Sequence, residues 1–329
     1  MANKLISGST TKQQINHLLG IFNKADSLLI LIQPDPDSIA SAMVLKRLLW
    51  RVVSKVAIAY FGKIQRLDNQ VMVESVKAPL VKMSKINVEE FSRFALIDSQ
   101  PHHSELFKDF KFDIIIDHHP HRNKPDAAYV DIRPEYGATA TIMTEYLRVS
   151  KIPPSKTLAT AILYAIKTDT SNFERGATGR DVEQFQYVFH YANRSLLSKI
   201  ERSELRIADL TLYRKAIKNM TITRNKVFTY LGNVTSPDIC VQLADFFMRV
   251  HKISWSIIAG LNNETLIIIF RCDGQRKDAG KLAIELFAAF GSAGGHKGAA
   301  RAEIPLSNLK GEIEDCSEIE RFLRDKLNI

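Results

Sequence analysis

Short apolar segments alternate with amphipathic ones through the first half of the chain. Four of the apolar segments are typical of buried strands, because each is a brief run of mainly aliphatic residues: 27–33, 56–62, 94–99 and 112–119. A helical pattern from about residue 38 to residue 51 lies between the first two. This strand-then-helix order predicts a mostly parallel sheet with helices on its faces. Such sheets bind ligands at the carboxyl ends of their strands.

Helical periodicity replaces the strand pattern in the middle of the chain. It predicts helices over 139–149 and 155–169, then a charged amphipathic run from about 180 to 218. Beyond that run the strand pattern returns. The expected elements are strands at 227–234, 253–261 and 265–272, helices near 238–250 and 278–290, and a glycine-rich turn after the last helix.

The pattern therefore predicts an α/β protein with two domains. A mostly parallel sheet is expected in an N-terminal domain at 1–190, and a smaller mixed-sheet α/β domain at 223–329. A helical linker at 191–222 would join them. With 329 residues, each domain is long enough to bury a core of its own.

Composition narrows the class of protein. The contents of 45% hydrophobic and 25% charged residues are those of an ordinary globular protein. No apolar run approaches the roughly 20 residues that span a bilayer, and the first 14 residues lack the apolar core of a secretory signal. We therefore expect a cytoplasmic protein with no membrane partner.

Charge and cysteine content add two further expectations. The formal net charge of +9 would attract polyanions such as nucleotides or RNA, although a solvated basic surface without a partner has the same composition. The three cysteines, Cys240, Cys272 and Cys316, are widely separated and show no spacing typical of a metal site. Unpaired thiols in a reducing compartment are the simpler reading.

Acidic side chains follow several of the predicted strands. Asp35 and Asp37 come directly after the first strand, Asp98 ends the third, and Asp117 with His118 and His119 ends the fourth. Asp35 and Asp37 by themselves fit a helix N-cap or a turn equally well. Their repetition at three strand ends is harder to explain by turns, because parallel strands bring these ends to one edge of the sheet.

Asp169, at the end of the predicted helix 155–169, adds a fifth carboxylate to this set. Carboxylates held close together repel one another, and a divalent cation removes that repulsion. Mixed aspartate and histidine ligands suit Mn²⁺ better than Ca²⁺. Two such ions would hold a phosphoryl group and activate water for its hydrolysis.

These residues resemble the motifs of the DHH phosphoesterase superfamily. Its four catalytic motifs are matched in order by PDPDSIASA, ALIDS, DIIIDHHPH and KTDTSNF, and Asp117, His118 and His119 form the tripeptide that names the family. The C-terminal half resembles the DHH-associated substrate-binding domain, through IIIFRC and GSAGGHKGAA. The arrangement is most similar to bacterial enzymes that degrade very short RNAs and 3′-phosphoadenosine 5′-phosphate, with cyclic-dinucleotide phosphodiesterases as near relatives.

The resemblance implies a role for each matching residue. Asp98 would bridge two Mn²⁺ ions, for which Mg²⁺ or Co²⁺ could substitute. Asp37, His118 and Asp169 would complete one site, and Asp35 would belong to the other. His119 would contact the scissile phosphate, and Asp117 would orient its histidine neighbours.

In the second domain, the resemblance implies that four residues bind the substrate's phosphate and terminal nucleotide: Arg271, Gly294, Gly295 and His296. A glycine-rich turn does let backbone N–H groups approach an anion, and arginine offers a planar fork for phosphate. Each feature also has an explanation without a function: the glycine-rich turn could be only a flexible exit from a helix, and Arg271 an ordinary surface residue.

One position departs from the family pattern H-x-x-x-D-x-D, because Leu31 stands where the histidine is expected. Leucine cannot bind a metal. Three outcomes follow: an enzyme with a looser first metal, a one-metal enzyme, or a protein that binds nucleotides without cleaving them. Gln33, His102 or His103 could replace the missing ligand, but each is explained more simply as an ordinary strand-end or loop residue.

The sequence as a whole favours a metal-dependent phosphoesterase acting on a small nucleotide or short RNA. The main rival is a nucleotide sensor without activity, and a pyrophosphatase or polyphosphatase of the same superfamily is a third reading. A homodimer is the default expectation for the assembly.

Overall fold

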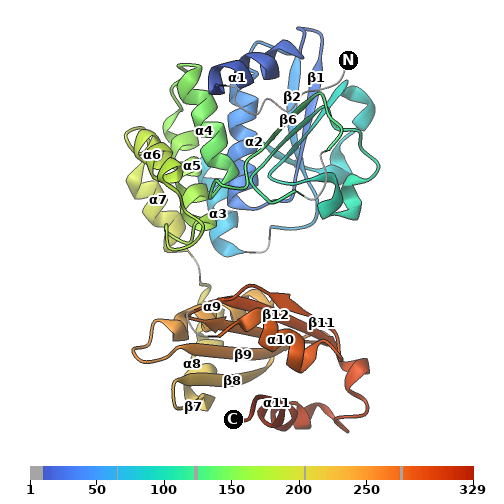
Figure 1. Cartoon of the computed structure of the whole chain (residues 1–329), viewed down its shortest axis with the longest axis vertical. Helices are drawn as coiled ribbons and strands as arrows, with labels where there is room; N and C mark the ends of the chain where they lie inside the picture. The colour runs from blue at the N-terminus through green and yellow to red at the C-terminus, as the bar shows by residue number, and fades with distance from the viewer. Residues whose placement is uncertain (1–9, 65, 122–124, 204, 275–276) are drawn as a thin grey trace. The chain divides into compact units, whose positions relative to one another are not determined.

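Two units make up the chain, Met1–Glu204 and Leu205–Ile329 (Figure 1). The structure, a computed structural model, describes residues 10–64, 66–121, 125–203, 205–274 and 277–329. The first nine residues of the segment considered for a signal lie outside these ranges. Within them, every helix is too short or too polar to cross a lipid bilayer.

The first unit is built on a sheet of six parallel strands in the order β3-β2-β1-β4-β5-β6. Aliphatic side chains fill both faces of its central strands, as expected where a parallel sheet is covered on both sides. The strands are β1 (Ser27–Ile32), β2 (Lys55–Tyr60), β3 (Leu80–Lys82), β4 (Arg93–Ile97), β5 (Ile114–Asp117) and β6 (Tyr129–Ile132).

Seven α-helices belong to the described part of this unit, and they lie on one side of its sheet in Figure 1. Leu28, Ile30 and Ile32 of β1 pack in one core with residues of α2, α4 and α5. The helices are α1 (Thr11–Gly20), α2 (Pro36–Leu48), α3 (Leu67–Val76), α4 (Thr139–Val149), α5 (Lys156–Asp169), α6 (Gly179–Phe189) and α7 (Arg194–Glu201).

The other face of the sheet has a smaller core of its own. Leu29 and Leu31 of β1 point to it, and Phe107 and Phe112 cover it from the loops between β4 and β5. Those loops contain short 3₁₀ turns, including Pro101–His103 and Glu105–Phe107. Successive residues of β1 therefore serve two different cores.

A buried ionic network joins β6 to α4. Arg133 donates to both Asp131 oxygens at 2.7 and 2.9 Å and to Glu145 at 2.7 Å, and all three residues are buried. Tyr146 donates a further hydrogen bond to Asp131. Charges buried this deeply are tolerated only because each has its partner, so the network fixes how α4 lies against the sheet edge.

The second unit has a mixed sheet in the order β11-β12-β10-β9-β8-β7, in which only β8 and β9 pair in parallel. Its strands are β7 (Thr221–Thr223), β8 (Lys226–Asn233), β9 (Trp255–Asn262), β10 (Thr265–Cys272), β11 (Ser292–Gly295) and β12 (Ala299–Pro305). Its helices are α8 (Leu210–Asn219), α9 (Asp238–Met248), α10 (Ala279–Phe287) and α11 (Ile319–Leu327). One core faces α10 and α11, and a second faces α8 and α9.

The predicted fold class is confirmed: a parallel-sheet α/β unit precedes a mixed-sheet one. Residues 191–222, expected as a helical linker, are shared between the units, since α7 lies in the first and α8 in the second. The charged run from 180 to 218 is three helices, α6 to α8, with breaks between them.

The glycine-rich stretch after α10 forms more than a turn, because it contains β11 and leads into β12. Gly295 has φ of +151°, and a Cβ there would lie 2.3 Å from the Ala299 carbonyl oxygen. A Cβ on Gly280 of α10 would lie 2.6 Å from the Gly295 oxygen. The glycines thus allow a hairpin that packs directly against the start of α10.

We predict that Arg133→Met lowers the free energy of unfolding of the first unit by about 3–5 kcal/mol, because it leaves Asp131 and Glu145 buried without a cation. Denaturation followed by circular dichroism measures the loss. Arg148→Met, which breaks the exposed ion pair between α4 and Glu183 of α6, is the matched control and should cost under about 1 kcal/mol. Equal losses in the two variants would contradict the prediction.

Candidate metal centre

Asp37 is held at the carboxyl edge of the parallel sheet by the start of a distant helix. It lies in the first turn of α2 and is 1% exposed. Its two oxygens accept hydrogen bonds of 2.7 Å each from the amides of Thr139 and Ala140, at the N-terminus of α4. The α4 N-cap residue, Ala138, offers no capping side chain, so Asp37 takes that role.

Asp98 follows β4 directly and turns its carboxylate toward the same place. Its φ of +59° is unusual for a residue other than glycine and re-aims the side chain at the end of the strand. The Thr139 hydroxyl donates to Asp98 Oδ1 at 2.8 Å. One residue of α4 thus binds two carboxylates, Asp37 through its amide and Asp98 through its side chain.

His118 faces three carboxylates. Its Nε2 lies 3.0 Å from Asp169 Oδ2, 3.7 Å from Asp98 Oδ1 and 4.0 Å from Asp37 Oδ2. Its Nδ1 lies 3.1 Å from the Tyr136 carbonyl oxygen, which can only accept, so Nδ1 carries a proton. This hydrogen bond leaves Nε2 as the atom that can bind a metal.

The arrangement concentrates negative charge in a buried place. Burial raises the pKa of Asp37 to about 7, with a further contribution from the charge of Asp169. Burial, and then the charge of Asp37, raise the pKa of Asp98 well above its usual range. Burial disfavours the charged form of His118, but the hydrogen bond to Asp169 and the charge of Asp37 raise its pKa to about 9.

The donor set fits a divalent cation. Asp37, His118 and Asp169 offer ligand atoms that all lie within 4.8 Å of one another, and Asp98, His118 and His119 form a second such group. A cation among them would replace the proton that His118 otherwise holds there, and would compensate the buried carboxylates. Imidazole with carboxylates is a donor set suited to Mn²⁺ and similar first-row ions.

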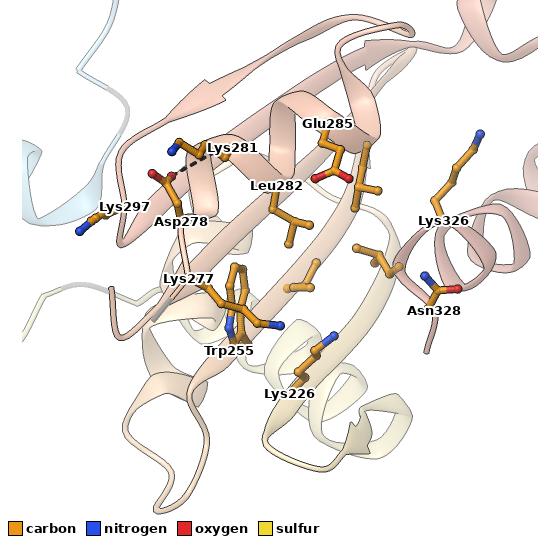
Figure 2. A pocket seen from close by; sticks show the side chains of 13 residues that line it. Lys226, Trp255, Lys277, Asp278, Lys281, Leu282, Glu285, Lys297, Lys326 and Asn328 are labelled. Atoms are coloured by element: carbon orange, nitrogen blue, oxygen red, sulfur yellow. Dashed lines mark hydrogen bonds between the residues drawn. The ribbon is translucent and has the colours of Figure 1, made fainter. Parts of the chain in front are cut away.

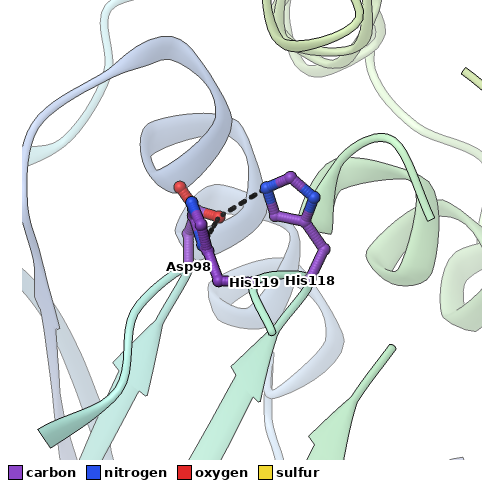
Figure 3. Close-up of side chains that lie close together, drawn as sticks. All are labelled: Asp98, His118 and His119. Carbon is purple, nitrogen blue, oxygen red and sulfur yellow. Dashed lines mark ion pairs between the residues drawn. The ribbon is translucent and has the colours of Figure 1, made fainter. Parts of the chain in front are cut away.

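His119 lies beside His118 and Asp98 (Figure 3), and Asp117 contacts His119 in turn. Asp117 is fully buried at the end of β5 and accepts from His119 Nδ1 at 2.8 Å, from the His118 amide at 2.9 Å and from Gln100 at 2.7 Å. Burial alone would raise the pKa of Asp117, but the hydrogen bonds from His119 and Gln100 lower it. Asp117 therefore orients the ring of His119, whereas the Tyr136 carbonyl orients the ring of His118.

Asp35 stands apart from the closest group. It is the N-cap of α2, and its Oδ1 accepts from the Ser38 amide at 2.8 Å. Desolvation by neighbouring atoms and then the charge of Asp169 raise its pKa, although the residue as a whole is exposed. Among the described residues, no group of close metal-binding atoms includes Asp35.

Leu31, at the position where the family has histidine, is buried and packs in the core formed with Phe107 and Phe112. Its three candidate replacements, Gln33, His102 and His103, are all exposed. His103 forms a close group with Asp117 and His119, and its Nδ1 accepts from the Gln100 amide at 3.2 Å. The structure thus places His103 close to two of the expected site residues, Asp117 and His119.

Asp169 ends α5, and the chain leaves it through an unusual turn. Ser171, Asn172 and Phe173 have φ of 48°, 57° and 67°, three consecutive left-handed residues without a glycine. Each costs of the order of 1 kcal/mol or more, and such strain clusters at functional sites. The motif KTDTSNF therefore supplies both a carboxylate and a turn that the fold must hold in place.

In the second unit, Arg271 and the glycine-rich turn lie at one end of the sheet, since Arg271 pairs with Ala299 and Gly295 with Ala300. Both already have partners. Arg271 Nε donates to Asp245 at 2.7 Å, and the His296 amide donates to the Ala299 carbonyl at 2.8 Å. The His296 and Lys297 carbonyls accept the first amides of α10, from Gly280 and Ala279.

Sequence reasoning missed three supporting residues: Thr139, Tyr136 and Asp181. Asp181 is buried and accepts from the Gly137 amide at 3.1 Å and from the Thr141 hydroxyl at 2.6 Å, which secures the chain just before α4. A signal was present, because the helix predicted to begin at Thr139 follows an alanine that cannot cap it. That gap implies a cap from elsewhere in the chain.

Part of the first unit is similar to a known family. Residues 29–166 match the DHH family, N-terminal domain. This part of the first unit is similar to that family's domain. An uncharacterized protein of Methanocaldococcus jannaschii is 35% identical over 309 residues, which are 92% of this chain but 63% of that protein. The chain therefore spans under two thirds of the length of this curated relative.

Two solved structures are also similar to this chain. An exopolyphosphatase-related protein from Bacteroides fragilis matches with a TM-score of 0.72, covering 99% of this chain and 98% of that one at 16% identity. At that identity the match shows the fold alone. A putative family II inorganic pyrophosphatase of Methanococcus jannaschii matches with a TM-score of 0.47 and 17% identity over 92% of this chain and 99% of that one.

We predict that Thr139→Val weakens the binding of a divalent cation, probed with Mn²⁺, by about tenfold or more, because Asp98 loses the hydroxyl that orients it. Titration calorimetry on the full chain measures the affinity. Thr144→Val is the matched control, since Thr144 lies on the same helix and its hydroxyl only donates to the Ala140 carbonyl. Unchanged affinity in Thr139→Val would show that Asp98 needs no such support.

Proposed function

We propose that this protein is a Mn²⁺-dependent phosphoesterase that hydrolyses short oligoribonucleotides, linear or cyclic dinucleotides, or 3′-phosphoadenosine 5′-phosphate. One observation carries the proposal: His118 Nε2 lies within 4.0 Å of carboxylate oxygens from Asp37, Asp98 and Asp169, which come from three separate elements. The order of the motifs that supply these residues supports the choice of phosphoester chemistry, and the net charge of +9 suits an anionic substrate.

Asp37, Asp98, His118 and Asp169 would hold one cation, and Asp35 with Asp98 would hold the other. When bound, such ions supply Lewis acidity that activates water and neutralises charge on the phosphoryl group. Leu31 contributes no ligand to the second position, so we expect that cation to be the more weakly held.

The chain's own groups would orient the substrate. His119 donates a hydrogen bond from Nδ1 to Asp117, and the same Nδ1 lies 3.9 Å from Asp98, so Nε2 is the ring atom left for a substrate. The hydrogen bond from His119 Nδ1 to Asp117 raises the pKa of the ring, which favours an imidazolium that donates to a phosphate oxygen. In the second unit, Arg271 and the turn at Gly294, Gly295 and His296 would bind the substrate's terminal phosphate, with Arg271 exchanging Asp245 for it.

A second candidate function rests on Leu31. With an apolar side chain packed in the core at that position, the protein could bind nucleotides without hydrolysing them. The two functions separate cleanly: calorimetry measures binding, and product analysis measures turnover. Tight binding of a dinucleotide without product in Mn²⁺, Mg²⁺ or Co²⁺ would favour the sensor.

We predict that Asp98→Asn lowers kcat/KM for a dinucleotide RNA by about 10³-fold or more, because it removes the carboxylate shared between the cation positions. Release of mononucleotides, followed by chromatography, is the measurement. Asp109→Asn, at an exposed position of the same unit, is the control and should keep full activity.

The same assay includes pyrophosphate as a competing substrate. Phosphate release from pyrophosphate, with no product from dinucleotide RNA or 3′-phosphoadenosine 5′-phosphate, would replace the proposed substrate class with that of a pyrophosphatase. Activity that survives in Asp98→Asn would remove the metal centre from the reaction.

A further inference from the structure

A pocket of about 610 Å³ lies in the second unit, between the sheet, α10 and α11 (Figure 2). Every residue that lines it belongs to this unit. Its size falls in the range of small-molecule sites, roughly 300–1,000 Å³. Arg271, proposed to bind the substrate, is in β10 but forms its ion pair with α9, on the opposite face of the sheet.

The lining of the pocket is strongly basic. Five lysines line it. Lys226 lies in β8, Lys281 in α10 and Lys326 in α11. Lys277 precedes the N-cap residue of α10, and Lys297 lies in the turn after β11. Two acidic residues, Asp278 and Glu285, also line it, which leaves three positive charges in excess.

Most of this charge has no counterion. Lys326 lies 3.5 Å from Glu312, but none of the other four lysines has an ion pair with any residue in the described ranges. Burial, and then the nearby positive charges of Lys277 and Arg224, lower the pKa of Lys226. Figure 2 shows Lys226 and Lys277 close together beside Trp255. Like charges gathered in a concave site favour an anionic ligand.

The rest of the pocket wall is apolar. Trp255 and Ile257 of β9 form its base and are 4% and 2% exposed, and Leu282 and Leu286 of α10 and Leu327 of α11 line its sides. A free inorganic anion would leave this apolar wall unused. A ligand with both a charged group and a flat apolar ring would use both parts of the lining.

We propose that this pocket binds a nucleoside diphosphate, with its phosphates on the lysines and its base against the wall around Trp255. The site is separate from the metal centre and does not depend on the proposed hydrolytic activity. A ligand held there would make the second unit a sensor of nucleotides as well as a substrate-binding module.

The test uses α,β-methylene-ADP, whose phosphorus–carbon bridge resists hydrolysis, with the full-length protein. Titration calorimetry gives the affinity. Trp50→Phe leaves Trp255 as the single tryptophan, because the chain has two and Trp50 is 66% exposed in the other unit, so fluorescence reports the pocket directly. We expect saturable binding in both measurements.

Variants assign the binding to the lysines. Lys281→Glu and Lys226→Gln should each raise Kd by about tenfold, the effect of losing one charge-assisted hydrogen bond. Lys310→Glu, an exposed lysine of the same unit away from the pocket, is the charge-matched control and should leave Kd unchanged. Asp98→Asn should also leave Kd unchanged, which separates this site from the metal centre.

Four results would overturn the proposal. They are the absence of saturable binding, equal affinity for pyrophosphate alone, equal affinity for adenosine alone, and binding that is lost in Asp98→Asn but kept in Lys281→Glu. The second would show that the apolar wall contributes nothing, and the third that the lysines contribute nothing. Failure here leaves the hydrolase untouched, because its assay follows product from the metal centre.

Discussion

The first unit depends on one electrostatic constraint: several carboxylates must remain buried together at the edge of a parallel sheet. Backbone amides at the start of α4 stabilise the buried carboxylate of Asp37 by donating hydrogen bonds to it, and the Thr139 hydroxyl does the same for Asp98. The positive end of a helix is the natural place for such groups. The amides do not compensate all of the negative charge, and the carboxylates of Asp37, Asp98 and Asp169 still face His118. This residual negative charge makes the site suitable for a metal cation.

Much of the fold was readable from the sequence because its strands are short aliphatic runs with acidic ends. The helix predicted at 139–149 matches α4, and the strand predicted at 265–272 matches β10. Short edge strands such as β3 and β6 were not expected, since three or four residues of mixed polarity carry no clear period. The hairpin after α10 was also missed, because its glycines serve a close approach between elements distant in sequence.

The acidic residues of the candidate site were predictable for the same reason that the sheet was. Parallel strands deliver their ends to one edge, so Asp37, Asp98 and His118 could be expected together. Their supporting contacts were not predictable. The carbonyl oxygen of Tyr136 orients the His118 ring. This contact depends on where the backbone lies, and the identity of residue 136 does not reveal it. The face on which Leu31 packs likewise follows from strand register, and the structure assigns it to the aromatic core.

The capping of α4 has a consequence for how this unit assembles. Its first amides are taken by Asp37, about a hundred residues earlier in the chain, and the segment before it by Asp181, about forty residues later. Neither partner is local, so the helix start gains its full stability only after distant parts of the chain have met, and such long-range closure slows folding. The site is therefore completed only when three segments that lie far apart in the sequence have come together.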